Sequence, residues 1–157
     1  MVSYLIMRMS WRLILPIFGL ILLTIANAKA DRAPINDVTE AIAKVRTGES
    51  PTVRTEAAEH LSQLTKRINP KDIDDTTLAD LVSLLDTRED SVRAWVAVSL
   101  GNLGPRARVA TPKLLEILAQ VECIAVVGGL TSEGAIRIAL KRMGAKVPPR
   151  PDCDKSR

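Results

Sequence analysis

Apolar residues recur at helical spacing through most of the chain after residue 30, and the clearest stretch is Asp90–Gly104, DSVRAWVAVSLGNLG. Its inward positions lie three or four residues apart, on one face of an α-helix: Val92, Val96, Ser99, Leu100 and Leu103. Asp90 or Ser91 is expected to cap the first turn through a side-chain oxygen. Gly104 and Pro105 end the helix, because glycine accepts a left-handed C-cap and proline cannot continue the turn.

Similar patterns predict helices before and after this one. Asn36 or Asp37 is expected to cap a helix that ends at Gly48, and a second helix is expected from Pro51 to about Lys66. Others are expected over 78–85, 112–121 and 132–143, with a loop at 105–107. The side chains expected to face inward in these helices are Val38, Ile42, Val45, Val53, Ala57, Leu61, Leu64, Leu78, Leu81, Val82, Leu84, Leu85, Leu114, Leu115, Ile117, Leu118, Val121, Ile136, Ile138, Ala139, Leu140 and Met143.

The helices repeat with a period of roughly 40 residues, which lies within the range of helical repeat proteins. Val53-Arg54 matches Val92-Arg93 at an offset of 39, and Gly104 matches Gly144 at an offset of 40. A shorter leucine-rich helix precedes each longer one, so the repeating unit is helix, turn, helix. Such a unit cannot bury its apolar face alone, and stacking of neighbouring units is expected to supply the core.

The repeating unit resembles the HEAT-repeat family, in the short form found in phycobilin-lyase-like proteins. The middle unit carries the pattern of a Val-Arg opening, small central residues and a Leu-Gly-x-Leu-Gly ending: Val92, Arg93, Ala94, Ala97, Ser99, Leu100, Gly101, Leu103 and Gly104. The first unit keeps the opening but has Ser62 and Thr65 at the glycine positions. The third keeps Leu140, Met143 and Gly144 but has Ser132-Glu133 at the opening.

This resemblance implies an all-α protein, an α-solenoid (armadillo-type superhelix) of about three HEAT-like hairpins over residues 36–146. It implies a concave surface lined by the second helix of each hairpin and no shared catalysis. It also implies that Arg54 and Arg93 brace neighbouring units, with Asp86, Glu89 or Asp90 as the acidic partner of Arg93. Contact of these arginines with a ligand is the alternative.

The start of the chain, over positions 1–30, has the layout of a secretory signal. Arg8 and Arg12 precede the apolar run Leu13–Ile25, and small residues follow, with cleavage expected after Ala28 or Ala30. The apolar run is shorter than the ~20 residues of a membrane-spanning helix. We expect a periplasmic or secreted protein without a membrane span in its mature chain; the alternative is an uncleaved anchor in the inner membrane. Residues 31–35 form a linker and 147–157 an extended, proline-rich tail.

Charge is distributed unevenly along the expected mature chain. It carries 19 basic and 18 acidic residues, because the leader holds three of the basic ones. Residues 31–90 contain 13 acidic and 8 basic side chains, whereas residues 91–157 contain 5 and 11. The near-neutral total argues against nucleic-acid binding. Ordinary solvated faces explain the asymmetry, and steering of an acidic partner or anionic surface to the basic end is the alternative.

The sequence offers no convincing catalytic constellation. His60 is the single histidine. No serine or cysteine has a histidine placed as its base, and a zinc site with one histidine would need cysteine or carboxylate help. The Asp72–Asp75 cluster lacks the glycine and glutamate of a calcium loop and is expected to cap a helix. We therefore expect no enzyme activity, cofactor or metal.

The expected function is partner binding by a monomeric, exported scaffold in the cell envelope. The candidate partner-binding surface consists of Arg54, His60, Arg93, Trp95, Val98 and Asn102. Trp95 occupies a position usually given to a small residue, and it is either a plug between repeats or an exposed aromatic anchor. An accessory role in cofactor or pigment attachment, carried over from the lyase-like branch, is the alternative.

Cys123 and Cys153 are expected to form a structural disulfide, because an even cysteine count in an exported chain favours a bridge. Such a bridge would stabilise the fold by roughly 3–4 kcal/mol. A buried thiol and a free thiol in the tail are the alternative. Intact mass spectrometry of the purified mature protein, with and without reductant, should show the gain of two hydrogen atoms on reduction; equal masses would contradict the bridge.

Overall fold

The computed structural model of the chain describes residues 34–121 and 130–150. Regular backbone in these two ranges is helical and includes no strand, which confirms the all-α class. The α-helices are α2 (Ile35–Thr47), α3 (Pro51–Arg67), α4 (Asp75–Ser83), α5 (Asp90–Leu103), α6 (Thr111–Val121) and α7 (Ser132–Arg142). Short 3-10 helices lie between some of them: η1 (Pro70–Asp72), η2 (Leu84–Asp86) and η3 (Gly104–Ala110). The expected leader, Met1–Ala30, and both cysteines lie outside the described residues.

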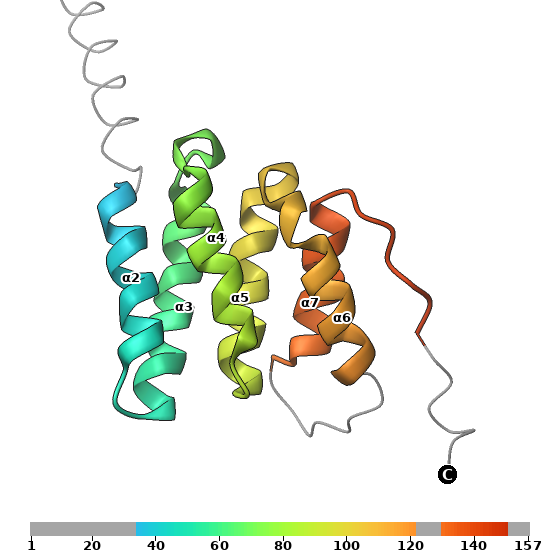
Figure 1. The fold of residues 1–157 in the computed structure, drawn as a ribbon, viewed down its shortest axis with the longest axis horizontal. Coiled ribbons are helices and arrows are strands. Elements are labelled where there is room, and N and C mark those ends of the chain that lie inside the picture. The colour runs from blue at the N-terminus through green and yellow to red at the C-terminus, as the bar shows by residue number, and fades with distance from the viewer. Residues whose placement is uncertain (1–33, 122–129, 151–157) are drawn as a thin grey trace, which may run out of the picture. The chain divides into compact units, whose positions relative to one another are not determined.

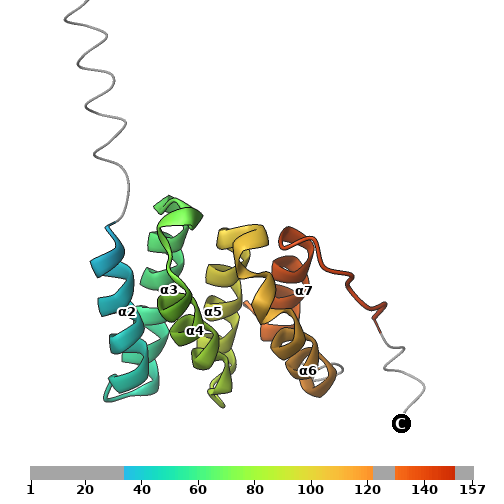
Figure 2. The same ribbon diagram turned by 45° about the horizontal axis from the view of Figure 1, so that its top comes forward.

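The helices pair in chain order. Helix α2 packs on α3, α4 with η2 packs on α5, and α6 packs on α7. Helix α5 also packs along α3 on one side and along α7 on the other, so these three helices form a row. Figure 1 shows α4 and α6 nearer the viewer than α5 and α7, and Figure 2 shows the same succession after a turn.

Local sequence signals set most of the helix ends. Pro51 starts α3, and the Ser50 hydroxyl accepts a hydrogen bond from the Val53 amide at 3.2 Å. Helices α5 and α7 end at Gly104 and Gly144, whose φ angles are +57° and +72°. Only glycine adopts such angles without steric cost, so both predicted ends are confirmed.

Side chains cap two further helices, and the cap by the Asp72–Asp75 cluster was predicted. Asp74 Oδ1 accepts a hydrogen bond of 2.7 Å from the Thr77 amide at the start of α4, and this bond lowers the pKa of the Asp74 carboxyl. Thr131 Oγ1 accepts from the Gly134 amide at 3.1 Å at the start of α7.

The predicted cap of α5 is wrong. Glu89 occupies the cap position of that helix without a side-chain hydrogen bond, and Asp90 is already helical. The Asp90 carboxylate extends to α7, where it accepts from the Ser132 amide at 3.2 Å and from the Ser132 hydroxyl. Asp90 therefore satisfies an unpaired amide of a neighbouring helix rather than one of its own.

The cap predicted for the first helix is wrong too. Helix α2 begins at Ile35, after Pro34, without a side-chain cap. Asn36 and Asp37 lie inside its first turn.

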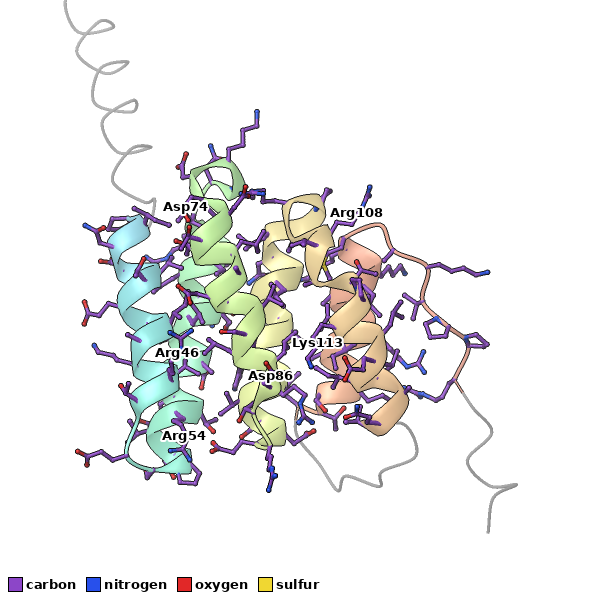
Figure 3. All side chains as sticks on the ribbon, in the orientation of Figure 1. Arg46, Arg54, Asp74, Asp86, Arg108 and Lys113 are labelled. Atoms are coloured by element: carbon purple, nitrogen blue, oxygen red, sulfur yellow. The ribbon has the colours of Figure 1, made fainter. Side chains whose placement is uncertain are left out.

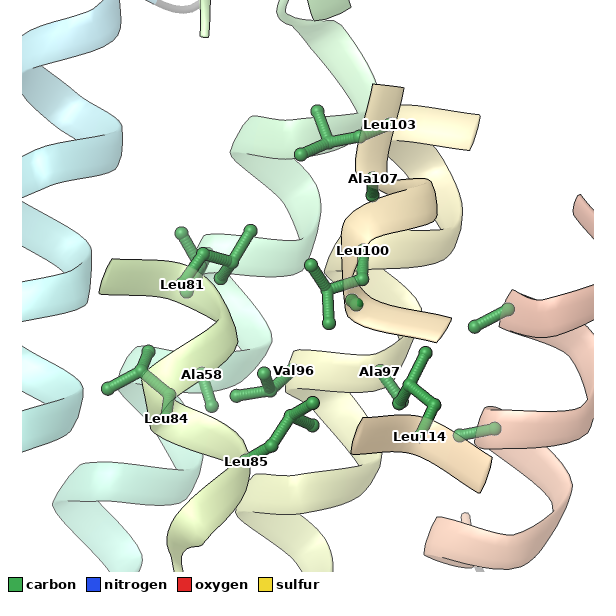
Figure 4. Close-up of a cluster of buried hydrophobic side chains, with 14 of the residues drawn as sticks. Ala58, Leu81, Leu84, Leu85, Val96, Ala97, Leu100, Leu103, Ala107 and Leu114 are labelled. Atoms are coloured by element: carbon green, nitrogen blue, oxygen red, sulfur yellow. The ribbon is translucent and has the colours of Figure 1, made fainter. Parts of the chain in front are cut away.

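The core lies between the first helix of each pair (α2, α4 and α6) and the second (α3, α5 and α7). Leucines from α4 and η2 meet apolar side chains of α5, η3 and α6, and Figure 4 shows Leu81 and Leu85 beside Val96 and Leu100. Helix α5 buries the most varied set of positions, including Ala94, Ala97 and Gly101, because both of its flanks are covered.

The predicted inward faces of α3 and α7 need correction. Val53 is 46% exposed and Ile138 is 53% exposed. A helix at the end of a row has a neighbour on one flank only, so apolar positions on the other flank stay in solvent. The predicted loop at 105–107 is also different, because these residues belong to η3.

Charged side chains join successive hairpins (Figure 3). Arg46 of α2 donates to Asp80 Oδ1 of α4 at 3.0 Å, and Lys113 of α6 lies 2.8 Å from Asp86 Oδ1 of η2. The hydrogen bond with Asp86 raises the pKa of Lys113. Both pairs are partly exposed to solvent, so they help to align neighbouring hairpins and add little to the free energy of unfolding.

The two arginines of η3 bond to segments that lie before and after η3 in the chain. Arg106 donates to the Ile73 carbonyl at 2.8 Å and to Asp75 Oδ1 at 2.6 Å. Arg108 donates to the Met143 carbonyl at 3.1 Å, at the end of α7. Segment η3 is thus tied both to the turn before α4 and to the last helix.

The segment after α7 runs back along that helix. Ala145 and Val147 pack against the core, and Arg137 of α7 donates to the Pro148 carbonyl at 2.7 Å. Arg150 donates to Glu133 Oε1, near the start of α7, at 2.8 Å. Residues 145–150 therefore cover part of the flank of α7 on which no further described helix packs.

The contact between α5 and α7 at Gly101 gives a stability prediction. A Cβ atom on Gly101 would lie 3.0 Å from the Cα atom and 3.2 Å from the Cβ atom of Ala139. Because backbone must shift to make room, Gly101→Ala should lower the free energy of unfolding by about 1–3 kcal/mol, measured by urea denaturation.

The control is Gly134→Ala in α7. The nearest atom to its new Cβ is the Thr131 hydroxyl oxygen at 3.2 Å, which belongs to a short side chain that can adjust. This variant should leave the free energy of unfolding unchanged or raise it by up to about 1 kcal/mol. Equal losses in both variants would contradict the close-packing account.

Candidate functional site

Helices α3, α5 and α7 present exposed or half-buried side chains at equivalent positions, which we call the α3–α5–α7 face. Helix α3 contributes Glu56, Glu59 and Gln63, α5 contributes Trp95, Val98 and Asn102, and α7 contributes Ile138 and Arg142; exposed Lys141, which corresponds to Gly101, precedes Arg142. Hydrogen bonds between neighbouring helices fix their alignment: Thr55 meets Ser91 at 2.9 Å, and Asn102 meets both Ser62 and Arg142.

The face changes character from one helix to the next. Glu56 and Glu59 make the α3 part acidic, whereas Lys141 and Arg142 make the α7 part basic. Between them, Trp95 and Val98 are half-buried and pack against the core, and Ile138 is exposed on α7. The result is an apolar centre between two charged edges.

Asn102 connects all three helices of the face. Its Nδ2 donates to the Ser62 carbonyl of α3 at 3.0 Å and to Thr65 Oγ1 at 3.3 Å. Its Oδ1 accepts from Arg142 Nη1 of α7 at 3.0 Å. Asn102 therefore has its hydrogen-bonding capacity engaged within the chain and positions the Arg142 guanidinium on the face.

Trp95 and His60 occupy different surroundings. The indole of Trp95 is neither fully buried nor fully exposed, so it both contributes to the core and shows a surface to solvent. His60 is exposed on α3, on the side of α2. The pKa of Glu40 in α2 is lowered by the hydrogen bond and charge of Lys44, and to a lesser extent by the charge of His60.

Arg54 is held inside the structure. Its Nε donates to Glu89 Oε1 at 2.8 Å, its Nη2 donates to the same oxygen, and its Nη1 donates to the Gly48 carbonyl at 2.6 Å. This guanidinium joins the first hairpin to the turn before α5, as expected of a bracing arginine.

The prediction of an acidic partner for Arg93 is wrong, because each of the three candidate acids pairs with another residue. Asp86 pairs with Lys113, Glu89 with Arg54 and Asp90 with Ser132. Arg93 instead donates to the Thr87 carbonyl. It lines a cavity near the start of α5 and α7, which we call the Arg93 cavity.

Of the six predicted surface residues, the structure brings together Trp95, Val98 and Asn102 on one helix face. Arg54 and Arg93 lie off that face at the hairpin junctions, and His60 lies at the α2 side of α3. Glu56, Glu59 and Arg142 were not among the predicted surface residues, and Ile138 was expected to face inward. The repeat offset of 40, applied from Val98 and Asn102, points to Ile138 and Arg142.

Comparison of the chain with protein-family models, with curated proteins and with solved structures finds no match. Within residues 34–121 and 130–150, no three His, Cys, Asp or Glu side chains gather as metal ligands would. In the same part of the chain, no helix combines the length and apolar character needed to cross a bilayer.

The bridging role of Asn102 gives a prediction with a matched control. Asn102→Ala removes two donor contacts to α3 and the acceptor for Arg142, and it should lower the free energy of unfolding by about 1–2 kcal/mol. Gln63 occupies the equivalent position on α3 and is exposed, with no hydrogen bond among the described residues. Gln63→Ala should change the free energy of unfolding by less than about 0.5 kcal/mol. Similar effects for both variants would contradict the bridging role.

Proposed function

We propose that this protein is an exported, non-catalytic α-solenoid of three HEAT-like hairpins that binds a protein partner through the α3–α5–α7 face. The observation that carries the proposal is the apolar centre of that face, Trp95, Val98 and Ile138, set between acidic and basic edges. Aromatic and aliphatic anchors surrounded by charged residues are typical of surfaces that bind proteins.

Equivalence between the hairpins supports a solenoid. Arg54 and Arg93 each donate to the carbonyl six residues earlier, Gly48 or Thr87. Gly104 and Gly144 end α5 and α7 with the same sign of φ. Helix α5 packs on the equivalent helix on each side, which is the nearest-neighbour contact that defines stacked repeats.

The charge pattern of the face indicates what a partner should carry. Residues opposite Glu56 and Glu59 should be basic, and residues opposite Lys141 and Arg142 should be acidic. An apolar side chain should lie over Trp95 and Val98. Complementary charges at the edges would set the orientation of the partner, while burial of the apolar centre would supply most of the affinity.

Export rests on the sequence pattern of residues 1–30, with a charged start, an apolar run and small residues. Binding would then take place in the cell envelope or outside the cell. A non-catalytic role rests on the chemistry of the chain. Its single histidine is exposed on α3, where no serine or cysteine neighbours it along the exposed side of the helix.

The proposal is tested by placing a charge in the apolar centre. Val98→Glu and Ile138→Glu should each reduce capture of the partner at least tenfold in a crosslinking pull-down from an envelope fraction, because burying an unpaired carboxylate costs several kcal/mol. Circular dichroism should show an unchanged helix content, since both side chains are already partly in solvent.

The matched control is Val109→Glu. Val109 is 68% exposed and lies on η3, beside Leu78 and Val82 of α4 rather than on the α3–α5–α7 face. This variant should capture the partner as the unmodified protein does. If Val109→Glu loses the partner while Val98→Glu retains it, a different surface binds.

A further inference from the structure

The three helices of the α3–α5–α7 face run in the same direction, with equivalent positions side by side. Hydrogen bonds near both ends of α5 show this alignment. They are Thr55–Ser91 and Ser62–Asn102 between α3 and α5, and Asp90–Ser132 and Asn102–Arg142 between α5 and α7. The place of a side chain on the face is therefore given by its helix and by its level along that helix.

The charges of the two outer helices lie at different levels. On α3, the repeat offset of 39 places Glu56 level with Trp95, which is about 4.5 Å before Val98 along the helix axis. On α7, the offset of 40 places Arg142 level with Asn102, which is about 6 Å beyond Val98. The acid and the base therefore lie diagonally across the face, on opposite sides of Val98.

This diagonal arrangement is its own complement under a two-fold rotation. An axis that stands perpendicular to the face at Val98 exchanges the two outer helices and reverses their direction. Glu56 of one copy then faces Arg142 of a second copy, and the reciprocal contact forms at the same time, as in every two-fold interface. Lys66, the base nearer the end of α3, then faces Thr131, which is uncharged.

The centre of the face supplies apolar contact in the same arrangement. Trp95 and Val98 are half-buried and show part of their surface to solvent. The two-fold axis places Val98 of each copy against the other, with the two Trp95 side chains on either side. Burial of this surface removes apolar area from water and favours association.

Overall charge and size are compatible with a weak dimer. The expected mature chain carries 19 basic and 18 acidic residues, so little long-range repulsion opposes the approach of two copies. Three helices about 9 Å apart and about 20 Å long would bury roughly 1,000 Å² in total when two such faces meet. This area lies at the weak end of specific interfaces.

We infer that the α3–α5–α7 face binds the same face of a second copy of this chain, with Glu56 of each copy opposite Arg142 of the other. A second copy meets the three requirements of a partner: a base opposite the acidic edge, an acid opposite the basic edge, and an apolar side chain over the centre. The inference rests on the proposed function, because it identifies the protein partner of the face. It replaces the monomer expected from the sequence with a two-fold dimer.

The test is analytical ultracentrifugation from about 1 μM to about 500 μM protein, the range in which an interface of this size associates. The chain is expressed in full, with its first 30 residues, and the purified protein is kept in reductant so that Cys123 and Cys153 cannot link two copies. The mean mass should rise from that of a monomer toward that of a dimer as concentration increases. A monomer mass at every concentration overturns the inference.

Charge reversals test the two-fold arrangement. Glu56→Arg and Arg142→Glu each place like charges opposite one another twice per dimer, so each should weaken self-association about tenfold or more. Mixed in equal amounts, the two variants should associate as the unmodified chain does, because each reversed charge then faces its opposite. The chain that carries both changes should also recover. Failure of both the mixture and the combined variant to recover overturns the inference.

Variants at other exposed side chains serve as controls. Arg142→Glu also removes the donor to Asn102 Oδ1, so the melting temperature of every variant is measured. If that variant is unstable, Lys141→Glu, at an exposed neighbour, replaces it in the same mixing experiment. Glu116→Arg reverses an exposed charge on α6, in the other layer of helices, and should leave self-association unchanged. A loss in Glu116→Arg equal to that in Glu56→Arg indicates a nonspecific charge effect and overturns the inference.

The inference and the proposed function fail in different ways. If the unmodified chain stays monomeric while Val98→Glu loses a protein captured from the envelope fraction, the face binds a different protein and only the inference is overturned. If a dimer forms and Val98→Glu does not weaken it, the two copies meet elsewhere. That result also overturns the inference, and the pull-down alone then decides the proposed function.

Discussion

The approach of α5 to α7 at Gly101 is the contact on which the described part of the structure depends. Without a side chain at that position, the α5 backbone comes close enough to Ala139 that an added Cβ would crowd the Ala139 Cα. This distance places the next residue, Asn102, where it spans from the Ser62 carbonyl to the Arg142 guanidinium. It also places Ile138, directly before Ala139, at the edge of the same surface. The close packing of α5 on α7 and the alignment of the candidate binding face thus both follow from the missing side chain at Gly101.

Much of the fold follows from local signals that the sequence displays. Pro51, Gly104 and Gly144 set helix ends because their backbone preferences act within one turn. What periodicity does not reveal is which flank of a helix has a neighbour. Val53 and Ile138 belong to apolar patterns, yet they stay in solvent because, within residues 34–121 and 130–150, α3 and α7 each have an equivalent helix on one side only. Asp90 was assigned to its own helix because capping is usually local, whereas here the nearest unpaired amide belongs to Ser132, in the following repeat.

The candidate site, like the fold, could be predicted from the sequence only in part. Trp95, Val98 and Asn102 share one helix face, so their spacing alone places them together. Arg142 and Glu59 join that face only when neighbouring helices are aligned, which needs the offsets of 39 and 40 to be applied to polar positions as well as apolar ones. The partner of Arg93 was sought among acids close to it in sequence. At the hairpin junctions, however, charged partners lie about one repeat apart, as in Arg54–Glu89 and Arg46–Asp80.

Because α3, α5 and α7 pack side by side in chain order, side chains that follow one another along the chain lie in the same order across the exposed face. The acidic half of residues 31–157 supplies α3 and the basic half supplies α7, so a charge asymmetry in sequence becomes an acidic and a basic edge flanking the apolar side chains of α5. The same asymmetry bears on the junctions. The first junction lies in the half with 13 acids, and Glu89 is available to Arg54; the second lies in the half with 5. The uneven charge of this chain therefore produces the polarity of its exposed face.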